Sequence, residues 1–190
     1  LKAPLNEVRV RKALSYLIDR DKIIDLLFSG QAQKIVGPVL PTKSYYHIGL
    51  DPYPFSVDSA VALLEDAGWK DSDGNGIRDK KINGRKVEMN FELMVASASS
   101  LFKDAAAIWR EDARKAEVDL QPKSLEFAAV RQKLKSRDFD LFGLAAGLDL
   151  GLDDLYQRWH TDNIETGGNL SGFGNAESDA LIDKIRSDIS

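Results

Sequence analysis

An alternation of strand and helix patterns through the middle of the chain limits its possible folds more than any other feature. Apolar side chains at every second position from Val87 to Val95 predict a strand with one buried face. The later patterns predict, in order, a helix over about 99–113, a short strand near 118–120, a helix over roughly 127–135 and a strand over 139–144. Strands that alternate with helices through short connections are typical of parallel βαβ units. The sequence therefore predicts an α/β fold with an open, mostly parallel sheet flanked by helices.

The segments around this unit are predicted to be helical, apart from one long loop. Helical spacing covers residues 10–18, 21–29 and 58–67 before the sheet, and about 153–159 and 176 onward after it. Four prolines among scattered aromatic residues predict an irregular but ordered loop over 31–57.

The loops at the carboxyl ends of the predicted strands are the candidate binding region, because open α/β sheets bind ligands there. These loops are residues 96–100, 123–125 and 145–152. The last one contains Gly147 and Gly151, which allow a close approach of the backbone, and the carboxylate of Asp149. From spacing alone a solvated loop acid is the simpler interpretation of Asp149, and its position at a strand end favours a binding role.

Several classes of site and partner are excluded by composition. The chain has no cysteine, which excludes disulfides, thiolate metal sites and a cysteine nucleophile. His47 and His160 are its only histidines, too few for a histidine-rich metal centre and little material for a Ser-His-Asp triad. The net charge of −4, without a dense basic stripe, argues against nucleic acid or an anionic membrane surface as a partner.

Residues 71–79 offer the oxygen pattern of a calcium loop. The candidate ligands are Asp71, Asp73, Asn75, Ile77 and Asp79, at loop positions 1, 3, 5, 7 and 9. Gly76 stands at position 6, but Ile82 at position 12 lacks the bidentate carboxylate that completes such a cage. A polar turn leading into an Asn83-Gly84 hairpin is therefore the favoured interpretation. A structural calcium ion is the alternative, and no other cofactor is expected.

Two further function classes stay open at this stage. A small hydrolase could use Asp149 or a serine between Ser97 and Ser100. The sequence contains no G-x-S-x-G elbow and places no histidine near either loop, which weakens this hypothesis. A pure interaction domain without a small ligand is the third possibility.

Three segments together resemble the family 5 extracellular solute-binding proteins, the peptide, dipeptide and nickel binders of ABC importers. Residues 4–20, PLNEVRVRKALSYLIDR, resemble the family's P-L-x-x-V-R-x-A-L-x-x-A-I-D-R stretch. Residues 59–69, SAVALLEDAGW, are similar to its A-x-x-L-L-x-E-A-G-[WY] helix, and 173–183, FGNAESDALID, to its G-[FY]-x-N-x-x-x-D-x-L-I ending. The segments occur in the family's order and spacing, and Trp159-His160-Thr161 with Asn169 also resemble lipoprotein members.

This resemblance implies that residues 1–190 form a single α/β lobe, the C-terminal lobe of a type II periplasmic clamshell. Such proteins close around a ligand by hinge motion, so both lobes contribute contacts. The implied partners are a peptide or other small solute, the N-terminal lobe of the same chain and the permease subunits of an ABC transporter. The implied location is the periplasm, with a possible lipid anchor, and no catalytic residues are expected. A nickel chelate or an oligosaccharide is the alternative solute.

The resemblance also implies a ligand set. In peptide-binding relatives [FY]-D is followed, after five residues, by W-x-x-D, and this aspartate receives the peptide's α-amino group. Laid on this sequence, Phe139-Asp140 begins the motif and Asp149 is the aspartate, which could form a charge-assisted bond with an ammonium. Ala146 replaces the tryptophan, which predicts a roomier pocket. The implied binding residues are Ala146, Gly147, Leu148, Asp149 and Trp159, of which Trp159 either lines the crevice or packs its own short helix.

Overall fold

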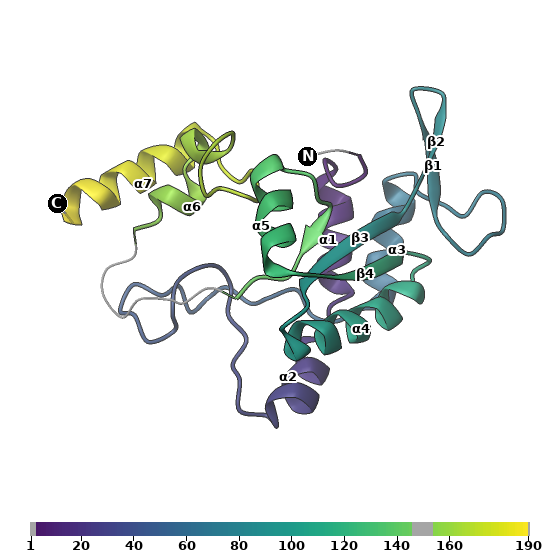
Figure 1. Ribbon diagram of the computed structural model, residues 1–190, viewed down its shortest axis with the longest axis horizontal. Coiled ribbons are helices and arrows are strands. Elements are labelled where there is room, and N and C mark those ends of the chain that lie inside the picture. Colours follow the sequence, from purple (N-terminus) through teal and green to yellow (C-terminus); the bar gives the residue numbers. More distant parts are fainter. Residues whose placement is uncertain (1–2, 146–153, 190) are drawn as a thin grey trace.

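A sheet of three parallel strands organises the chain (Figure 1). The computed structural model describes residues 3–145 and 154–189, the last two of these in backbone only. The strands are β3 (Asn90–Ala96), β4 (Asp119–Leu125) and β5 (Leu141–Phe142), in the order β4-β3-β5. The predicted α/β fold with a parallel sheet is confirmed. The predicted site residues Ala146, Gly147, Leu148 and Asp149 lie outside the described residues.

The two crossover helices cover opposite faces of the sheet. Helix α4 (Ser100–Arg114) joins β3 to β4, and α5 (Phe127–Ser136) joins β4 to β5. Leu93 and Val95 pack against Ala106 of α4. Glu92, which points to the other face because strand side chains alternate, lies 4.0 Å from Lys133 of α5. Strand β3 is consequently covered on both sides.

The main core lies where α1 (Val8–Tyr16) and α3 (Val57–Asp66) pack against the start of the sheet. Leu64 and Trp69 are fully buried in it, and Trp69 follows shortly after the end of α3. Helix α2 (Arg20–Phe28) begins after Asp19, whose carboxylate accepts a hydrogen bond from the backbone N–H of Lys22.

A buried arginine joins three segments beside this core. The guanidinium of Arg78 donates to the backbone carbonyl oxygens of Trp69 and Ala116, both at 2.9 Å. Its Nη2 lies 3.2 Å from a carboxylate oxygen of Glu117. These bonds tie together the segments that follow α3 and α4, and they satisfy two backbone carbonyl groups there.

The predicted strand from Val87 to Val95 is divided in two. Strands β1 (Asp79–Ile82) and β2 (Arg85–Glu88) form an antiparallel hairpin that projects from the body, with Asn83 and Gly84 at positive φ in its turn (Figure 1). The partner changes at Met89: its N–H still donates to the carbonyl of Arg78, the next residue in the hairpin register, and its carbonyl accepts from the N–H of Asp119, the first residue of β4. The alternation continues across this change of partner, so side-chain pattern alone could not reveal the break.

The prediction of a loop at 123–125 is also wrong. Residues 123–125 complete β4 and pair in parallel with Met94, Val95 and Ala96 of β3. Lys123 and Ser124 are polar and exposed, which an edge strand such as β4 tolerates.

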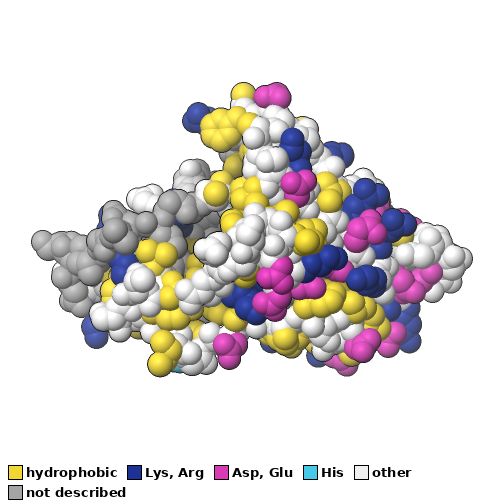
Figure 2. Space-filling view, turned by 90° about the horizontal axis from the view of Figure 1, so that it is seen from below, with side chains coloured by type: hydrophobic (Ala, Val, Ile, Leu, Met, Phe, Trp, Pro, Cys, Tyr) yellow, Lys and Arg dark blue, Asp and Glu magenta, His cyan; other side chains and the backbone are white. Residues whose placement is uncertain are grey.

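The remaining segments lie outside the sheet and its helices. Residues 29–56 form no helix or strand, which covers the predicted loop over 31–57 except for Val57, the first residue of α3. Helix α6 (Tyr156–Trp159), the 3-10 turn η1 (Thr161–Asn163) and α7 (Ala176–Ile189) group together at one end of the molecule (Figure 1). Within the described part of the chain, no helix has the length and apolar character to span a bilayer. Basic and acidic side chains are interspersed over the face shown in Figure 2.

Phe91 gives a direct test of this core. Phe91 is 1% exposed, so Phe91→Ala should lower the free energy of unfolding by about 3–5 kcal/mol through loss of buried contacts and creation of a cavity. Phe127→Ala is the control, because that ring is 64% exposed, and its effect should stay within about 0.5 kcal/mol. Urea denaturation followed by circular dichroism measures both. Similar losses for the two variants would contradict the assignment of Phe91 to the core.

Candidate functional site

The strand order β4-β3-β5 places a switch point at the carboxyl end of β3, on the side where β5 lies. From β3 the chain crosses to β4 on one side, and from β4 it crosses back past β3 to β5. The connecting helices lie on opposite faces, so the loops that leave β3 and β4 diverge. Ligand crevices of open α/β sheets form at such points.

Two hydrogen bonds join the diverging loops. The backbone N–H of Ser97 donates to the carbonyl of Leu125 at 2.8 Å. The Ser97 hydroxyl donates to Oε1 of Glu126, also at 2.8 Å. Ser99 has a different role, because its Oγ accepts from the backbone N–H of Phe102 and caps α4. The polar pair at this edge is therefore Ser97–Glu126, next to the exposed ring of Phe127.

Sequence reasoning missed Glu126 and considered Ser97 only as a possible nucleophile. Glu126 lies one residue beyond the predicted loop, and its partner is 29 positions away in the sequence. Neither histidine contacts this pair in the described part of the chain. His47 Nδ1 accepts from Gly49 N–H, and His160 lies among the residues of α6, η1 and α7. A Ser-His arrangement for hydrolysis is therefore not assembled by the described residues.

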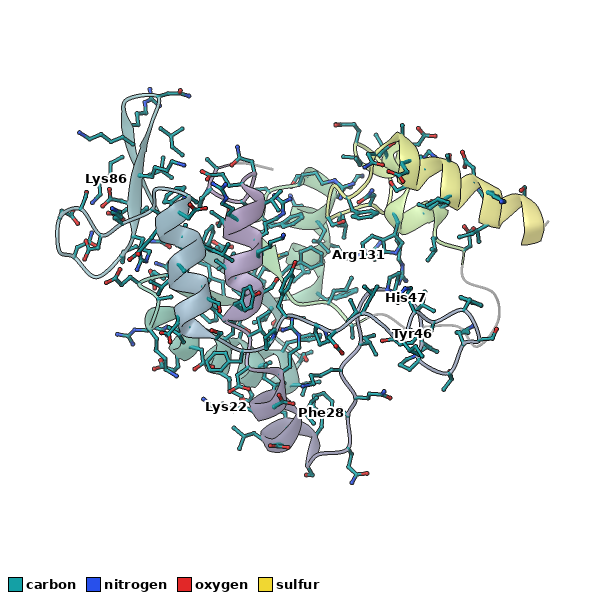
Figure 3. All side chains as sticks on the ribbon, turned by 180° about the vertical axis from the view of Figure 1, so that it is seen from behind. Lys22, Phe28, Tyr46, His47, Lys86 and Arg131 are labelled. Atoms are coloured by element: carbon teal, nitrogen blue, oxygen red, sulfur yellow. The ribbon has the colours of Figure 1, made fainter. Side chains whose placement is uncertain are left out.

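The long segment 29–56 runs on the side of the sheet toward which β3 and β4 point (Figure 1). It carries exposed apolar side chains, among them Ile48, which is 90% exposed. Figure 3 shows Tyr46 and His47 on this segment and Arg131 on α5. The segment is anchored at its end, where Ser56 N–H donates to the carbonyl of Tyr16 at 3.0 Å.

Trp159 is half-buried and packs within its own small unit. Its ring makes an edge-to-face contact with Phe173, with ring centroids 5.6 Å apart. This contact matches the packing alternative, and a ligand contact by Trp159 stays a prediction. His160 is buried, and its Nδ1 accepts from the backbone N–H of Asp162, so this side chain caps η1.

A hollow of about 490 Å³ lies at the opposite edge of the sheet. It is lined by residues at the amino ends of the strands, such as Asn90 and Phe139, and by Arg137. Arg137 donates to the carbonyl oxygens of Ile164 and Gly167, at 2.7 and 2.8 Å. This hollow is not at the switch point, so the candidate site remains the carboxyl edge.

The aspartates of residues 71–79, called here the acidic loop, lie close together, as their spacing in the sequence suggests. One carboxylate oxygen from each of Asp71, Asp73 and Asp79 lies within 4.8 Å of the other two. Asp71 accepts from the backbone N–H groups of three following residues, among which the Gly76 bond contributes most to lowering the pKa of Asp71. Asp79 is buried and accepts from Ser72, whose hydroxyl contributes most to lowering the pKa of Asp79.

The ammonium of Lys86 lies among these carboxylates. Its Nζ contacts Asp73, lies 2.9 Å from Oε1 of Glu88 and 3.8 Å from Oδ2 of Asp79. The hydrogen bond with Asp73 is the main reason that the pKa of Lys86 is raised. Asn75 is engaged within the loop, because its Oδ1 accepts from Ile77 N–H and its Nδ2 donates to Glu88. The arrangement fits the polar turn before the hairpin, and calcium binding stays a prediction.

Comparison with known proteins identifies the family of this chain. The model of the bacterial extracellular solute-binding proteins, family 5 Middle, matches residues 1–166. The chain belongs to this family. The resemblance noted from the three sequence segments is therefore confirmed.

The relatives of this family 5 chain are named for different solutes. The oligopeptide-binding protein AppA of Bacillus subtilis is 27% identical over 182 residues, which is 94% of this chain and 33% of AppA. The nickel-binding periplasmic protein of Escherichia coli is 34% identical over 119 residues, 63% of this chain and 22% of that protein. The chain thus spans about a third or less of the length of these relatives.

Solved structures agree with the fold. AppA in complex with a nonapeptide superposes with a TM-score of 0.84 at 26% identity, covering 94% of this chain and 35% of AppA. The oligopeptide-binding protein of Thermus thermophilus, complexed with a pentapeptide, gives 0.83 at 22% identity, covering 95% and 33%. At that identity the second likeness supports the fold alone.

Lys86 should contribute to the stability of the acidic loop. Lys86→Met removes the ammonium and leaves buried Asp79 and its neighbours without their cation, so the midpoint of thermal unfolding should fall. Lys81→Met is the control, since Lys81 lies opposite Lys86 across the hairpin and, among the described residues, makes no ion pair with a carboxylate. Differential scanning calorimetry compares the two. An equal midpoint for both variants would show that the ammonium has no stabilising role.

The lowered pKa of Asp79 predicts that the protein loses stability at acidic pH. Its pKa is lowered in the folded state, so its contribution is present above the unfolded value of about 3.9 and is lost as pH falls through the folded pKa. Thermal unfolding midpoints between about pH 6 and pH 2.5 should therefore fall more steeply for the wild type than for Asp79→Asn. Parallel curves would contradict this role of the carboxylate.

Proposed function

We propose that residues 1–190 form one lobe of a two-lobed binding protein that captures peptides for an ABC importer. The main support is family membership over residues 1–166, together with the 94% coverage by AppA, whose structure holds a nonapeptide. The peptide would bind at the carboxyl edge of β3 and β4, and the rest of the protein would close over it. Since both lobes supply contacts, the isolated lobe should bind weakly.

The proposal assigns no catalytic residues to this lobe. The family consists of solute-binding proteins, and the hydroxyls of Ser97 and Ser99 are bonded to Glu126 and to the N-terminus of α4. The proposed partners are the N-terminal lobe of the same chain and the permease subunits. The proposed location is the periplasm, with anchoring as a lipoprotein.

A nickel chelate is the second candidate solute. The nickel-binding periplasmic protein of Escherichia coli supports it, with 34% identity over 119 residues. The site would have to hold the organic part of such a chelate, since neither histidine contacts the Ser97–Glu126 pair in the part of the chain that the structure describes.

Asp149 provides the test of peptide capture. If Asp149 receives the peptide's α-amino group, Asp149→Asn in the complete protein should weaken binding about a hundredfold or more, because breaking a buried ion pair costs about 3–5 kcal/mol. The measurement is calorimetry with a peptide and its N-acetylated twin. Asp140→Asn is the control, because Asp140 precedes β5 at the opposite edge and accepts from Glu92 N–H.

The outcomes separate the candidate solutes. Peptide capture predicts that the wild type prefers the free amine and that Asp149→Asn removes the preference, while Asp140→Asn keeps it. Equal affinity for both peptides, unchanged in Asp149→Asn, would contradict amine recognition. Absence of any peptide binding, together with binding of a nickel chelate, would favour the second candidate.

A further inference from the structure

Glu126 lies at the carboxyl edge of the sheet, beside the switch point at the end of β3. It occupies the position before the first residue of α5, but its side chain makes no capping bond to that helix. Its Oε1 instead accepts the hydroxyl hydrogen of Ser97, from the end of the neighbouring strand. The carboxylate is therefore held across the gap between the two diverging loops.

This carboxylate has no cation beside it among the described residues. No lysine or arginine of 3–145 or 154–189 lies within ion-pair distance of Glu126. The neighbouring Lys123 is paired with Glu92, and the guanidinium of Arg131 lies 6.0 Å from the centre of the Phe127 ring. Only Oε1 has a hydrogen-bond partner in the described chain, so Oε2 is available to another donor.

The free-energy cost of an unpaired carboxylate depends on whether the edge is open to solvent. The cost is small while the edge is exposed and large once a second lobe covers it. Glu126 is exposed here, so water hydrates its charge. If a second lobe closes over this edge, a neutral ligand would bury the carboxylate without a partner, which carries a large desolvation penalty. A ligand with a positive group would compensate it through a charge-assisted bond. The unpaired acid therefore selects against neutral ligands as well as for cationic ones.

We propose that Glu126, oriented by Ser97, is a specificity residue that accepts a hydrogen bond from a basic side chain, lysine or arginine, of the captured peptide. This inference rests on the proposed function, and it adds a second recognition point besides the peptide's α-amino group. Ser97 is a positioning residue in this scheme, because its hydroxyl fixes one carboxylate oxygen and directs the other toward the ligand.

The test uses the complete protein and a defined set of peptides. Pentaalanine is compared by calorimetry with five variants, each carrying lysine at one position, because the register of binding is not assumed. The wild type should bind at least one lysine peptide about tenfold or more tightly than pentaalanine. Glu126→Gln, which keeps an acceptor for Ser97, should remove that preference and leave pentaalanine binding unchanged or tighter. Ser97→Ala should reduce the preference without removing it.

Glu111→Gln is the matched control. Glu111 is an exposed glutamate near the far end of α4, paired with Arg114, and its loss should leave the preference intact. A lysine preference that survives in Glu126→Gln, or a wild type that binds pentaalanine and all lysine peptides equally, would overturn the inference while peptide capture stands. Failure of the wild type to bind any of the six peptides would overturn both.

Discussion

The pairing of β3 with a parallel partner on each side is the constraint on which the rest of the structure depends. Parallel neighbours require crossovers, and right-handed crossovers in opposite directions place α4 and α5 on opposite faces. Strand β3 must then be apolar on both faces where it is covered, as Leu93, Met94 and Val95 are. The same two crossovers make the loops diverge at the carboxyl edge. Core and candidate site are therefore consequences of one strand order.

Arg78 has a complementary role at the other end of the sheet. Its guanidinium bridges the segments that follow α3 and α4, and its own carbonyl accepts from Met89 as the chain passes from the hairpin into β3. A buried guanidinium is costly unless its donors are satisfied. Here carbonyl groups and the carboxylates of Glu65 and Glu117 surround it. The junction fixes where β3 begins, and so fixes its register with β4.

Much of the fold was predictable because local patterns and packing agree. The alternation through Phe91 and Val95 and the helical face of α4 both indicated the elements that the structure contains. The break at Met89 was not predictable, because it is a change of hydrogen-bond partner without a change of side-chain pattern. The candidate site was even harder to predict from the sequence. The Ser97–Glu126 contact joins residues 29 positions apart, and no local rule indicates such a pair.

The acids of this chain illustrate how context decides what a carboxylate does. Asp79 is buried, accepts hydrogen bonds from Ser72 and has the ammonium of Lys86 nearby. Its charge is therefore compensated within the fold and stabilises the loop before the hairpin. Glu126 has one hydroxyl partner and no cation among the residues described, so solvent compensates the rest of its charge while the edge is open. Spacing could not separate the two, since both acids stand in polar stretches between predicted elements. What separates them is the partner of the charge. The charge of Asp79 is balanced by groups of the protein, so ligand binding elsewhere leaves its environment unchanged. The charge of Glu126 is balanced mainly by solvent, so a ligand that displaces this solvent must supply a partner for it.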